Sequence, residues 1–325
     1  MMAALKHDPG LLARLPKVRG RYVAQVELAG STWFRVGGGA DVVFRPEDAR
    51  DLATFLAACP KDIPHTVLGL GSNLLVRDGG VRGVVIRLDR AFNKFELDGE
   101  YVIAGAGVLD VNLARVCRDA GLGGFEFMRG IPGTIGGGLR MNGGAYGRSF
   151  RDGLIWAEAV DGAGEMHRAN LDELDLSYRH CGAPDDWIFT AAHFRGRKGG
   201  QDDITARMRA VSQARKDSQP VNTRTGGSTF KNPGGENPNG AKAWELIDQA
   251  GCRGLIRGGA QVSELHCNFL INTGGATAAD LEALGEEVRR RVQVHSGIML
   301  QWEIRIIGEH DPDNVPELIR AEGTP

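Results

Sequence analysis

Glycine is distributed unevenly along this chain, and its clusters limit what the chain can fold into. The sequence holds 47 glycines in 325 residues, which is roughly twice the ordinary usage of ~7%. They show no fixed G-X-Y repeat, which excludes a collagen-like protein. The densest segment, RGIPGTIGGGLRMNGGAYGR at residues 129–148, loses much conformational entropy on folding and contributes little packing volume. We therefore predict that the main chain of this segment lies directly against a ligand.

The rest of the composition is that of a folded protein with ordinary cores. Hydrophobic residues make up 42% and charged residues 25%, which argues against disorder. The net charge of -2 lacks the basic excess of a dedicated nucleic-acid binder. The five cysteines form no CxxC pair and no zinc-like spacing. Since the sequence contains no run of ~18 apolar residues and no apolar export signal, we expect a cytoplasmic protein with reduced thiols, no metal and no membrane or nucleic-acid partner.

Hydrophobic periodicity and turn residues predict an α+β or mixed α/β chain whose pattern changes near residue 200. A short helix is expected at residues 11–15. The next helix is expected to start at Pro46, and the one after it to end at Gly121. The glycine-rich segment and a polar stretch at 222–240 are expected to be irregular loops. Strands, some of them joined by tight turns, are predicted in 31–48, 65–88, 101–105, 154–170, 187–195, 268–275 and 300–308, and helices in 46–59, 110–121, 203–219, 241–251 and 276–297.

Two short glycine motifs look like dinucleotide fingerprints but lack the required context. A Rossmann loop has to open a helix whose N-terminal amides bind the pyrophosphate. The motif at 69–74 instead runs into a predicted strand, and the motif at 105–107 is followed by Asp110 where the third glycine is needed. Either motif can therefore be a tight turn in a hairpin-rich domain. Ser72 and Asn73 favour an anion site in the first motif, because small donors beside exposed amides suit a phosphate.

Six motifs occur in one order over nearly the whole chain: FRVGG, LGLGSNLLVRDGG, RGIPGTIGGGLRMNGGAYG, LSYRHC, GGSTFKNP and VSELHCNFLIN. In this order the chain resembles the UDP-N-acetylenolpyruvoylglucosamine reductases, flavoenzymes that complete UDP-N-acetylmuramate for bacterial peptidoglycan, in the shorter of the family's two forms. The resemblance implies an α+β fold with a two-part FAD-binding domain of the vanillyl-alcohol oxidase (PCMH) type and an α+β C-terminal substrate-binding domain. The implied ranges are 1–90 and 91–202 for the two parts, 203–310 for the substrate-binding domain and 311–325 for a polar tail.

The resemblance also implies the reaction. NADPH would reduce non-covalently bound FAD and leave, and the enolpyruvyl sugar nucleotide would then enter the same pocket. Hydride transfer to the enolpyruvyl double bond builds negative charge on the adjoining carboxylate and requires a proton at the neighbouring carbon. By the family pattern, Ser228 donates this proton and Arg179 grips the carboxylate with two parallel hydrogen bonds. Glu303 joins Arg179 around the same carboxylate.

These assignments compete with ordinary structural interpretations. Ser228 can be a turn serine, Arg179 a surface arginine paired with an acid, and Glu303 the solvent-facing residue of a strand. His266 can be a buried histidine that bonds the backbone. Arg215 can simply suit the C-terminal end of a helix, where a cation is favourable.

The other functional positions follow from the family pattern. The predicted FAD-binding residues are Gly69, Gly71, Ser72, Asn73, Leu74, Gly130, Ile131, Pro132, Gly133, Thr134, Asn142, Gly144, Ala145 and Arg305. The predicted substrate-binding residues are Tyr178, Arg215, Lys231, Asn232, Glu264 and His266. Two positions depart from the pattern, since Gly39 stands where proline is expected and Cys181 where serine is expected.

Two other functions stay open. A flavin oxidase of the same superfamily would act on an alcohol or hydroxy acid and pass its electrons to oxygen. A regulatory module would use the glycine loops only to sense a nucleotide. For the reductase we expect a UDP-sugar as partner and a part in cell-wall synthesis, cell shape and cell division, and a monomer is compatible with the sequence.

Overall fold

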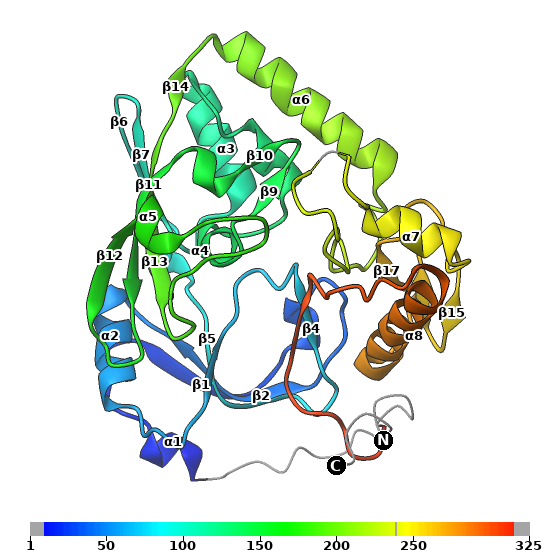
Figure 1. The fold of residues 1–325 in the computed structure, drawn as a ribbon. Coiled ribbons are helices and arrows are strands. Elements are labelled where there is room, and N and C mark those ends of the chain that lie inside the picture. Colours follow the sequence, from blue (N-terminus) through cyan, green and yellow to red (C-terminus); the bar gives the residue numbers. More distant parts are fainter. Residues whose placement is uncertain (1–9, 238, 315–325) are drawn as a thin grey trace.

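Three structural units, each with its own sheet, follow one another along the chain (Figure 1). The computed structural model describes residues 10–237 and 239–314, so most of the predicted polar tail lies outside the described residues. None of the helices in these residues is long and apolar enough to cross a membrane. The prediction of an α+β chain with a two-part first domain and a separate C-terminal unit is confirmed.

The first unit is a four-stranded sheet with helix α2 (Ala49–Ala58) on one face. In sheet order its strands are β1 (Arg21–Glu27), β2 (Gly39–Arg45), β5 (Val81–Ile86) and β3 (His65–Val67). Strand β1 is antiparallel to β2, whereas β2, β5 and β3 are mutually parallel. Their carboxyl ends therefore meet at one edge of the sheet, which is where α/β sheets bind ligands. The short elements are α1 (Leu11–Arg14), η1 (Ala29–Ser31), β4 (Leu74–Val76) and η2 (Arg90–Phe92).

The second unit is a five-stranded antiparallel sheet with helices packed on its inner face. In sheet order its strands are β12 (Met166–Asn170), β11 (Leu154–Val160), β13 (Ile188–Arg195), β7 (Tyr101–Gly105) and β6 (Phe95–Asp98). Its helices are α3 (Asp110–Asp119), α4 (Ile135–Arg140), α5 (Leu171–Leu174) and α6 (Gln201–Ser218). Its short elements are β8 (Leu122–Gly123), η3 (Glu126–Gly130), β9 (Gly144–Ala145), β10 (Arg148–Ser149), η4 (Phe150–Asp152) and β14 (Arg197–Lys198).

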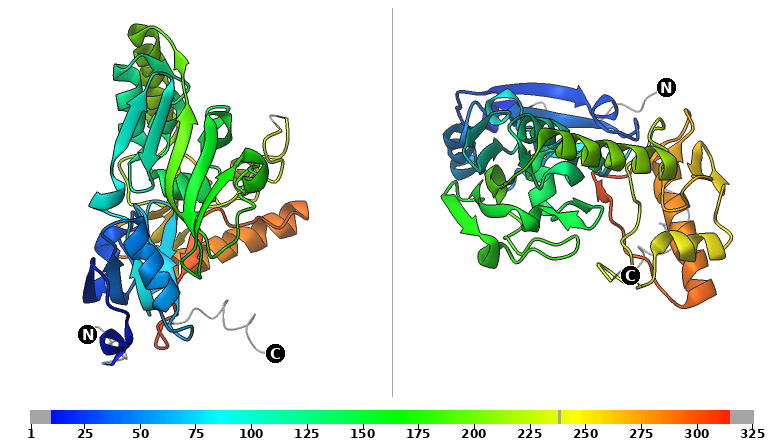
Figure 2. Two further views of the ribbon diagram at one scale, coloured as in Figure 1. Left: turned by 90° about the vertical axis from the view of Figure 1, so that its left-hand side faces the viewer. Right: turned by 90° about the horizontal axis from the view of Figure 1, so that it is seen from above.

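Helix α6 leads from the second unit to the third (Figure 2). It packs against η3 and α3, and its buried residues Ile204 and Met208 belong to the core of the second unit. The third unit then forms a small sheet against two helices. Its elements are α7 (Ala243–Gln249), β15 (Ile256–Arg257), β16 (Ala260–Val262), β17 (Leu270–Asn272) and α8 (Ala278–Ser296). The domain division at residue 203 stays a prediction.

The end of the described chain returns to the first unit. Strand β18 (Arg305–Ile307) pairs in parallel with β4, and Phe34, Val36 and Leu75 of the first unit lie in the core of the third. The two units therefore share a hydrophobic core.

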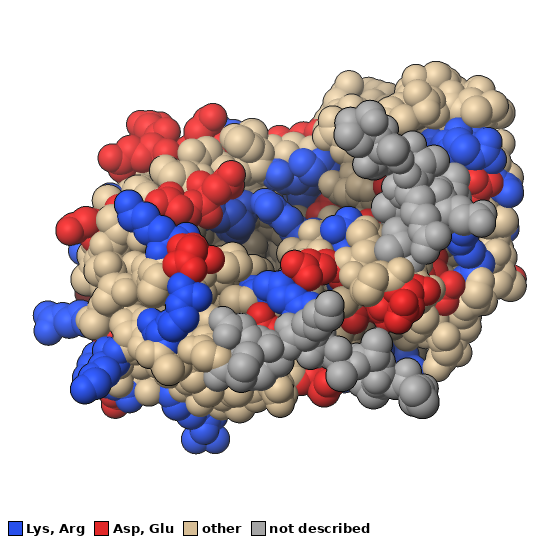
Figure 3. Space-filling model, turned by 90° about the horizontal axis from the view of Figure 1, so that it is seen from below, with Lys and Arg blue, Asp and Glu red and all other residues tan. Residues whose placement is uncertain are grey.

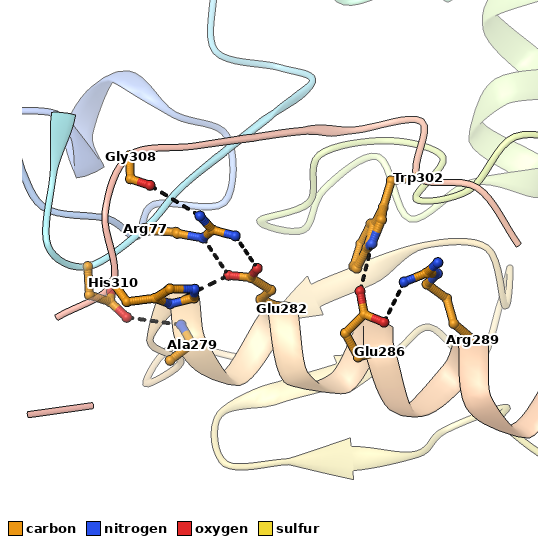
Figure 4. A network of polar contacts seen from close by, with 9 residues as sticks. Arg77, Ala279, Glu282, Glu286, Arg289, Trp302, Gly308 and His310 are labelled. Carbon is orange, nitrogen blue, oxygen red and sulfur yellow. Dashed lines mark hydrogen bonds and ion pairs between the residues drawn. The ribbon is translucent and has the colours of Figure 1, made fainter. Parts of the chain in front are cut away.

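A buried ion pair also ties α8 to the first unit (Figure 4). Arg77 donates through Nε and Nη2 to the two carboxylate oxygens of Glu282, at 3.0 and 2.7 Å. The Glu282 side chain is only 6% exposed, and His310 Nδ1 lies 4.0 Å from it. Asp78 adds a second connection, because its carboxylate accepts hydrogen bonds from the first two amides of α8, where a negative charge is favourable.

Several predicted elements are confirmed, including the 154–170 hairpin and the long helix α8. Thr277 and Asp280 form the capping box of α8, and Gly121 follows α3 with a φ of 67°. The predicted helix start at Pro46 is wrong, because Asp48 caps α2 by accepting the amide hydrogen bond of Asp51.

Three further predictions are wrong because tertiary contacts outweigh local propensity. Residues 31–36 form no strand, because Ser31 ends η1 and residues 32–34 are bends in which Trp33 N bonds Gly71 O. The strand β1 before them was missed. The 129–148 segment is not irregular throughout, because it forms η3, α4 and the β9–β10 hairpin. In α4, a Cβ at Gly136 would lie 2.9 Å from Ala106 Cβ, so glycine allows close packing there. Of the expected 300–308 strand, only β18 forms.

Candidate active site

The site is built around an ion pair between residues far apart in the sequence. Arg179 Nε donates a 2.6 Å hydrogen bond to Glu303 Oε1. The side chains are 19% and 8% exposed, so water screens the pair weakly. Burial raises the pKa of the Glu303 carboxyl, and the nearby charges of Arg179 and Lys231 oppose that shift. The interpretations of Glu303 as a solvent-facing residue and of Arg179 as a surface cation are therefore excluded.

A tight turn carries Tyr178 and Arg179 at its tip. Ser177 and His180 exchange backbone hydrogen bonds of 3.2 and 3.1 Å, and Arg179 has a φ of 50°. This left-handed conformation costs a non-glycine residue free energy, which is typical of functional sites. Asn142 supports the turn, because its Nδ2 donates to Ser177 O at 3.0 Å while its Oδ1 accepts a main-chain amide. The buried side chain of Asn142 is thus part of the support of this turn, and its role toward FAD stays a prediction.

The polar loop of the third unit runs beside Glu303. The Glu303 amide donates to Thr229 O at 2.8 Å, and Lys231 N donates to Gln301 O at 2.9 Å. Ser228, one residue before Thr229, is partly exposed and pairs with the backbone next to β17. The structure therefore brings Ser228, Lys231 and Glu303 into one region.

Asn232 joins this loop to the turn of the second unit. Its amide donates to the Tyr178 hydroxyl at 3.2 Å, and its Oδ1 accepts the amide of the first residue of α7 at 3.0 Å. Burial raises the pKa of Tyr178, so the phenol stays neutral. Sequence reasoning missed Asn268, whose buried side chain makes two hydrogen bonds to the backbone of Phe230 (3.0 and 2.8 Å). The sequence signal that could have indicated Asn268 is an asparagine at the start of the apolar run NFLIN.

The loop at Gly69–Asn73 has the properties of an anion site. Among the described residues, none of its backbone amides donates a hydrogen bond to the protein. Gly69 is exposed, but the residues from Leu70 to Asn73 are buried or half-buried, and amides in such positions usually find acceptors. Gly71 has a φ of 71°, and a Cβ there would collide with the carbonyl oxygen of Ser31. Consecutive unpaired amides in a turn form a concave nest that binds phosphate. The row of amides without a protein acceptor therefore favours an anion site over a tight turn alone.

The two glycine-rich loops face each other beside the ion pair. A Cβ at Gly69 would lie 3.1 Å from Thr134 Oγ1, and Asn73 Nδ2 donates to Glu303 O at 3.1 Å. Arg305 N in turn donates to Asn73 O at 2.9 Å. The other predicted FAD-binding residues lie in or beside these loops: Ser72 and Leu74 in the first, Gly130, Ile131, Pro132 and Gly133 before α4, and Gly144 and Ala145 in β9. Seen from below, several Lys and Arg side chains border a hollow in the surface, with Asp and Glu side chains among them (Figure 3).

Three predicted substrate residues make no hydrogen bond or ion pair with Arg179 or Glu303 in the described part of the chain. Arg215 lies in the last turn of α6 and donates to Gln219 Oε1 at 3.2 Å. Burial lowers its pKa. In the part of the chain that the structure describes, neither Glu264 nor His266 contacts Arg179 or Glu303. Burial lowers the pKa of His266, and its Nδ1 accepts a backbone amide at 3.3 Å, as a buried structural histidine does. Their substrate roles stay predictions.

The two departures from the family pattern have mild structural consequences. Gly39 opens β2 opposite Glu27, within an intact strand pair. Cys181 is half-buried, and burial raises the pKa of its thiol, so it stays neutral beside the Arg179 turn. No group of three or more His, Cys, Asp or Glu within residues 10–237 and 239–314 could hold a metal ion.

The fold and the site together define an FAD-dependent oxidoreductase. Residues 40–170 match the model of an FAD binding domain, and residues 219–307 match the C-terminal domain of UDP-N-acetylenolpyruvoylglucosamine reductase. The reductases of Parvibaculum lavamentivorans and Rhodospirillum rubrum are 59% and 58% identical over 94% of this chain and cover 97% and 96% of their own lengths. The crystal structure of the Thermus caldophilus reductase superposes with a TM-score of 0.76 at 34% identity, over 90% of this chain and 100% of that chain. The chain therefore belongs to the UDP-N-acetylenolpyruvoylglucosamine reductase family, as its motifs predicted.

Proposed function

We propose that the protein reduces UDP-N-acetylglucosamine enolpyruvate to UDP-N-acetylmuramate, with NADPH as electron donor and non-covalently bound FAD. The observation that carries the proposal is the buried Arg179–Glu303 pair beside Lys231 and the two glycine-rich loops. A carboxylate that gains negative charge during a reaction is stabilised by cationic groups held in a weakly hydrated site.

Glu303 orients Arg179 for the substrate. It engages the Nε atom, and among the described residues the two Nη atoms of Arg179 have no hydrogen-bond partner. These atoms can therefore form the two parallel bonds that a carboxylate accepts from a guanidinium. Because burial raises the pKa of Glu303, this carboxyl can share a proton when a second carboxylate arrives.

Ser228 is the proposed proton donor at the carbon next to the carboxylate. A serine hydroxyl is a weak acid, so its conjugate base needs a nearby cation, and Lys231 lies three residues away on the loop beside Glu303. The unpaired amides of Gly69–Asn73 fit the diphosphate of FAD, and Thr134 lies across from them. When bound there, FAD would supply the hydride.

A stopped-flow experiment tests the reaction. NADPH should bleach the flavin absorbance of the purified protein, and the enolpyruvyl sugar nucleotide should restore it. Because one pocket serves both substrates in turn, steady-state kinetics should follow a parallel-line, ping-pong pattern. Intersecting lines, or reoxidation that ignores the sugar nucleotide, would contradict the proposal.

A flavin oxidase acting on an alcohol or hydroxy acid is the second candidate. The polar loop at 222–240 argues against it, because Asn232 connects that loop to the Arg179 turn and an oxidase has little use for such a loop. Oxygen consumption with alcohols or hydroxy acids, and none of the reductase reaction, would favour the oxidase.

We also propose that the protein works in the cytoplasm as a monomer and supports cell-wall synthesis, cell shape and cell division. The membership of the family supports this setting. Light scattering of the purified holoenzyme tests the monomer. Depletion in the source cells, followed by microscopy and analysis of uridine-linked precursors, tests the cellular role, since the enolpyruvyl precursor should accumulate.

A further inference from the structure

Arg87 lies at the sheet edge that carries the Gly69–Asn73 loop, and the proposed reaction does not use it. It directly follows β5, and Arg45 ends the neighbouring parallel strand β2. Since Phe44 is the register partner of Ile86, Arg45 and Arg87 are neighbours at the carboxyl edge of the sheet. The loop that follows β3 begins at the same edge, because Leu68 N donates to Ile86 O at 2.9 Å.

Both arginine side chains point to the face covered by that loop. Side chains alternate along a strand, so Arg45 and Arg87 share the face of Val43 and Val85. These two valines pack with Leu68, immediately before the loop. The opposite face, with Val42 and Ile86, packs against α2. The arginines are therefore on the cofactor side of the first unit.

The local charge is not balanced. Asp89 forms an ion pair with Arg45 and lies 3.9 Å from Arg87 Nε, so two cations face one carboxylate. Burial lowers the pKa of Arg87 and of Arg45. The charge of Arg45 lowers the pKa of Arg87 further, and the charge of Arg21 does the same to Arg45. An anion that approaches a partly desolvated cation with this excess of positive charge around it would be stabilised.

Arg87 is also held in position beside the loop. Its Nη1 donates to Ser31 Oγ at 2.9 Å, and the carbonyl oxygen of Ser31 packs directly against Gly71. The Nε atom of Arg87 is buried without a hydrogen-bond partner. Within residues 10–237 and 239–314, Nη2 also has none. Nε and Nη2 of Arg87 are therefore hydrogen-bond donors available to a ligand beside the unpaired amides of Gly69–Asn73.

We propose that Arg87 binds the diphosphate of FAD, together with the amides of Gly69–Asn73. This inference rests on the proposed location of FAD over that loop. The amides supply neutral donors, and Arg87 supplies the positive charge that the loop itself lacks. An anion that contacts a guanidinium and several amides gains charge-assisted hydrogen bonds.

The test compares flavins with and without the diphosphate. The full-length protein is freed of flavin, and its Kd for FAD and for riboflavin is measured by flavin fluorescence titration. Arg87→Met should weaken FAD binding by about tenfold to a hundredfold, as expected for a lost hydrogen bond to a charged group, and should change riboflavin binding by less than about twofold. Arg87→Lys keeps the positive charge but loses the planar guanidinium with its paired donors, so its Kd for FAD should lie between those of wild type and Arg87→Met.

Arg21→Met is the matched control. Arg21 is exposed and pairs in register with Arg45, but it belongs to the edge strand β1, two strands away from β5 and farther still from β3 and its loop. The variant therefore removes an equal charge at a greater distance from the loop. It should leave both affinities within about twofold of wild type, as expected of a screened surface charge. If Arg87→Met does not fold, Arg87→Lys and Ser31→Ala carry the test, because both should weaken FAD binding and spare riboflavin binding.

Three results would overturn the inference. FAD affinity within twofold of wild type in the Arg87 variants would remove Arg87 from the site. Equal weakening for FAD and riboflavin would make Arg87 a structural residue. Equal wild-type affinities for FAD and riboflavin would refute the location of the diphosphate itself. None of these results depends on turnover, so they are separate from a failure of the proposed reaction, which wild-type kinetics would reveal.

Discussion

The Arg77–Glu282 pair of Figure 4 allows a quantitative stability prediction. Arg77→Met removes both hydrogen bonds to Glu282 and leaves a carboxylate that is 6% exposed, with His310 4.0 Å away. Stranding a buried charge in this way costs about 3–5 kcal/mol of unfolding free energy. The opposite change, Glu282→Met, should cost less, because Arg77 is 30% exposed and can turn toward water. Combining both changes removes both charges, so the double variant should be more stable than Arg77→Met alone.

The assay is urea denaturation followed by circular dichroism and tryptophan fluorescence, with coincident transitions as the check for two-state unfolding. Arg290→Met is the control on the same helix. Arg290 pairs with Glu287 through two hydrogen bonds of 2.8 Å, but its side chain is 55% exposed. An exposed pair contributes about 0–1 kcal/mol. A loss below about 1 kcal/mol for Arg77→Met, or a double variant that loses the sum of both single changes, would refute the reasoning.

Three further predictions concern the site and its surroundings. Ser228→Ala should leave flavin reduction by NADPH nearly intact and slow flavin reoxidation by the enolpyruvyl substrate by about 10²–10⁴-fold. Stopped-flow absorbance measures both half-reactions, and equal losses in the two would indicate a binding or folding defect. Arg179→Lys should slow flavin reoxidation, because an ammonium cannot form two parallel bonds to a carboxylate. The flavin content, measured by absorbance, should stay unchanged. Loss of bound flavin would instead mean that Arg179 binds the cofactor. Burial lowers the pKa of His193 to about 4, so the unfolded chain binds more protons than the folded one between about pH 6.5 and pH 4. The contribution of His193 to stability is therefore complete above pH 6.5 and lost as the pH falls to 4, and thermal melts of His193→Phe should show a weaker dependence on pH in that window than wild type.

Local sequence signals were sufficient for most helices and hairpins. Helix α8 has a capping box and a buried stripe of Leu281, Leu284 and Val288 within nineteen residues, so its own residues specify it. The 154–170 hairpin likewise has alternating strands around a turn, with Gly164 at a φ of 85°. The short helix α4 was missed because glycine disfavours helices, and its stability comes from packing against residues distant in the sequence.

Motif order alone determined the family, the cofactor and the candidate residues Ser228, Arg179 and Glu303, because these are properties of residue type and spacing along the chain. Only the tertiary structure decided that Glu303 is buried against Arg179, that the Asn142 side chain bonds the backbone of the Arg179 turn, and that His266 Nδ1 accepts a backbone amide. The physical reason is that burial, and with it the pKa of Glu303, depends on how three units meet. Residues 124 positions apart come within 2.6 Å there, and no local pattern records such a contact.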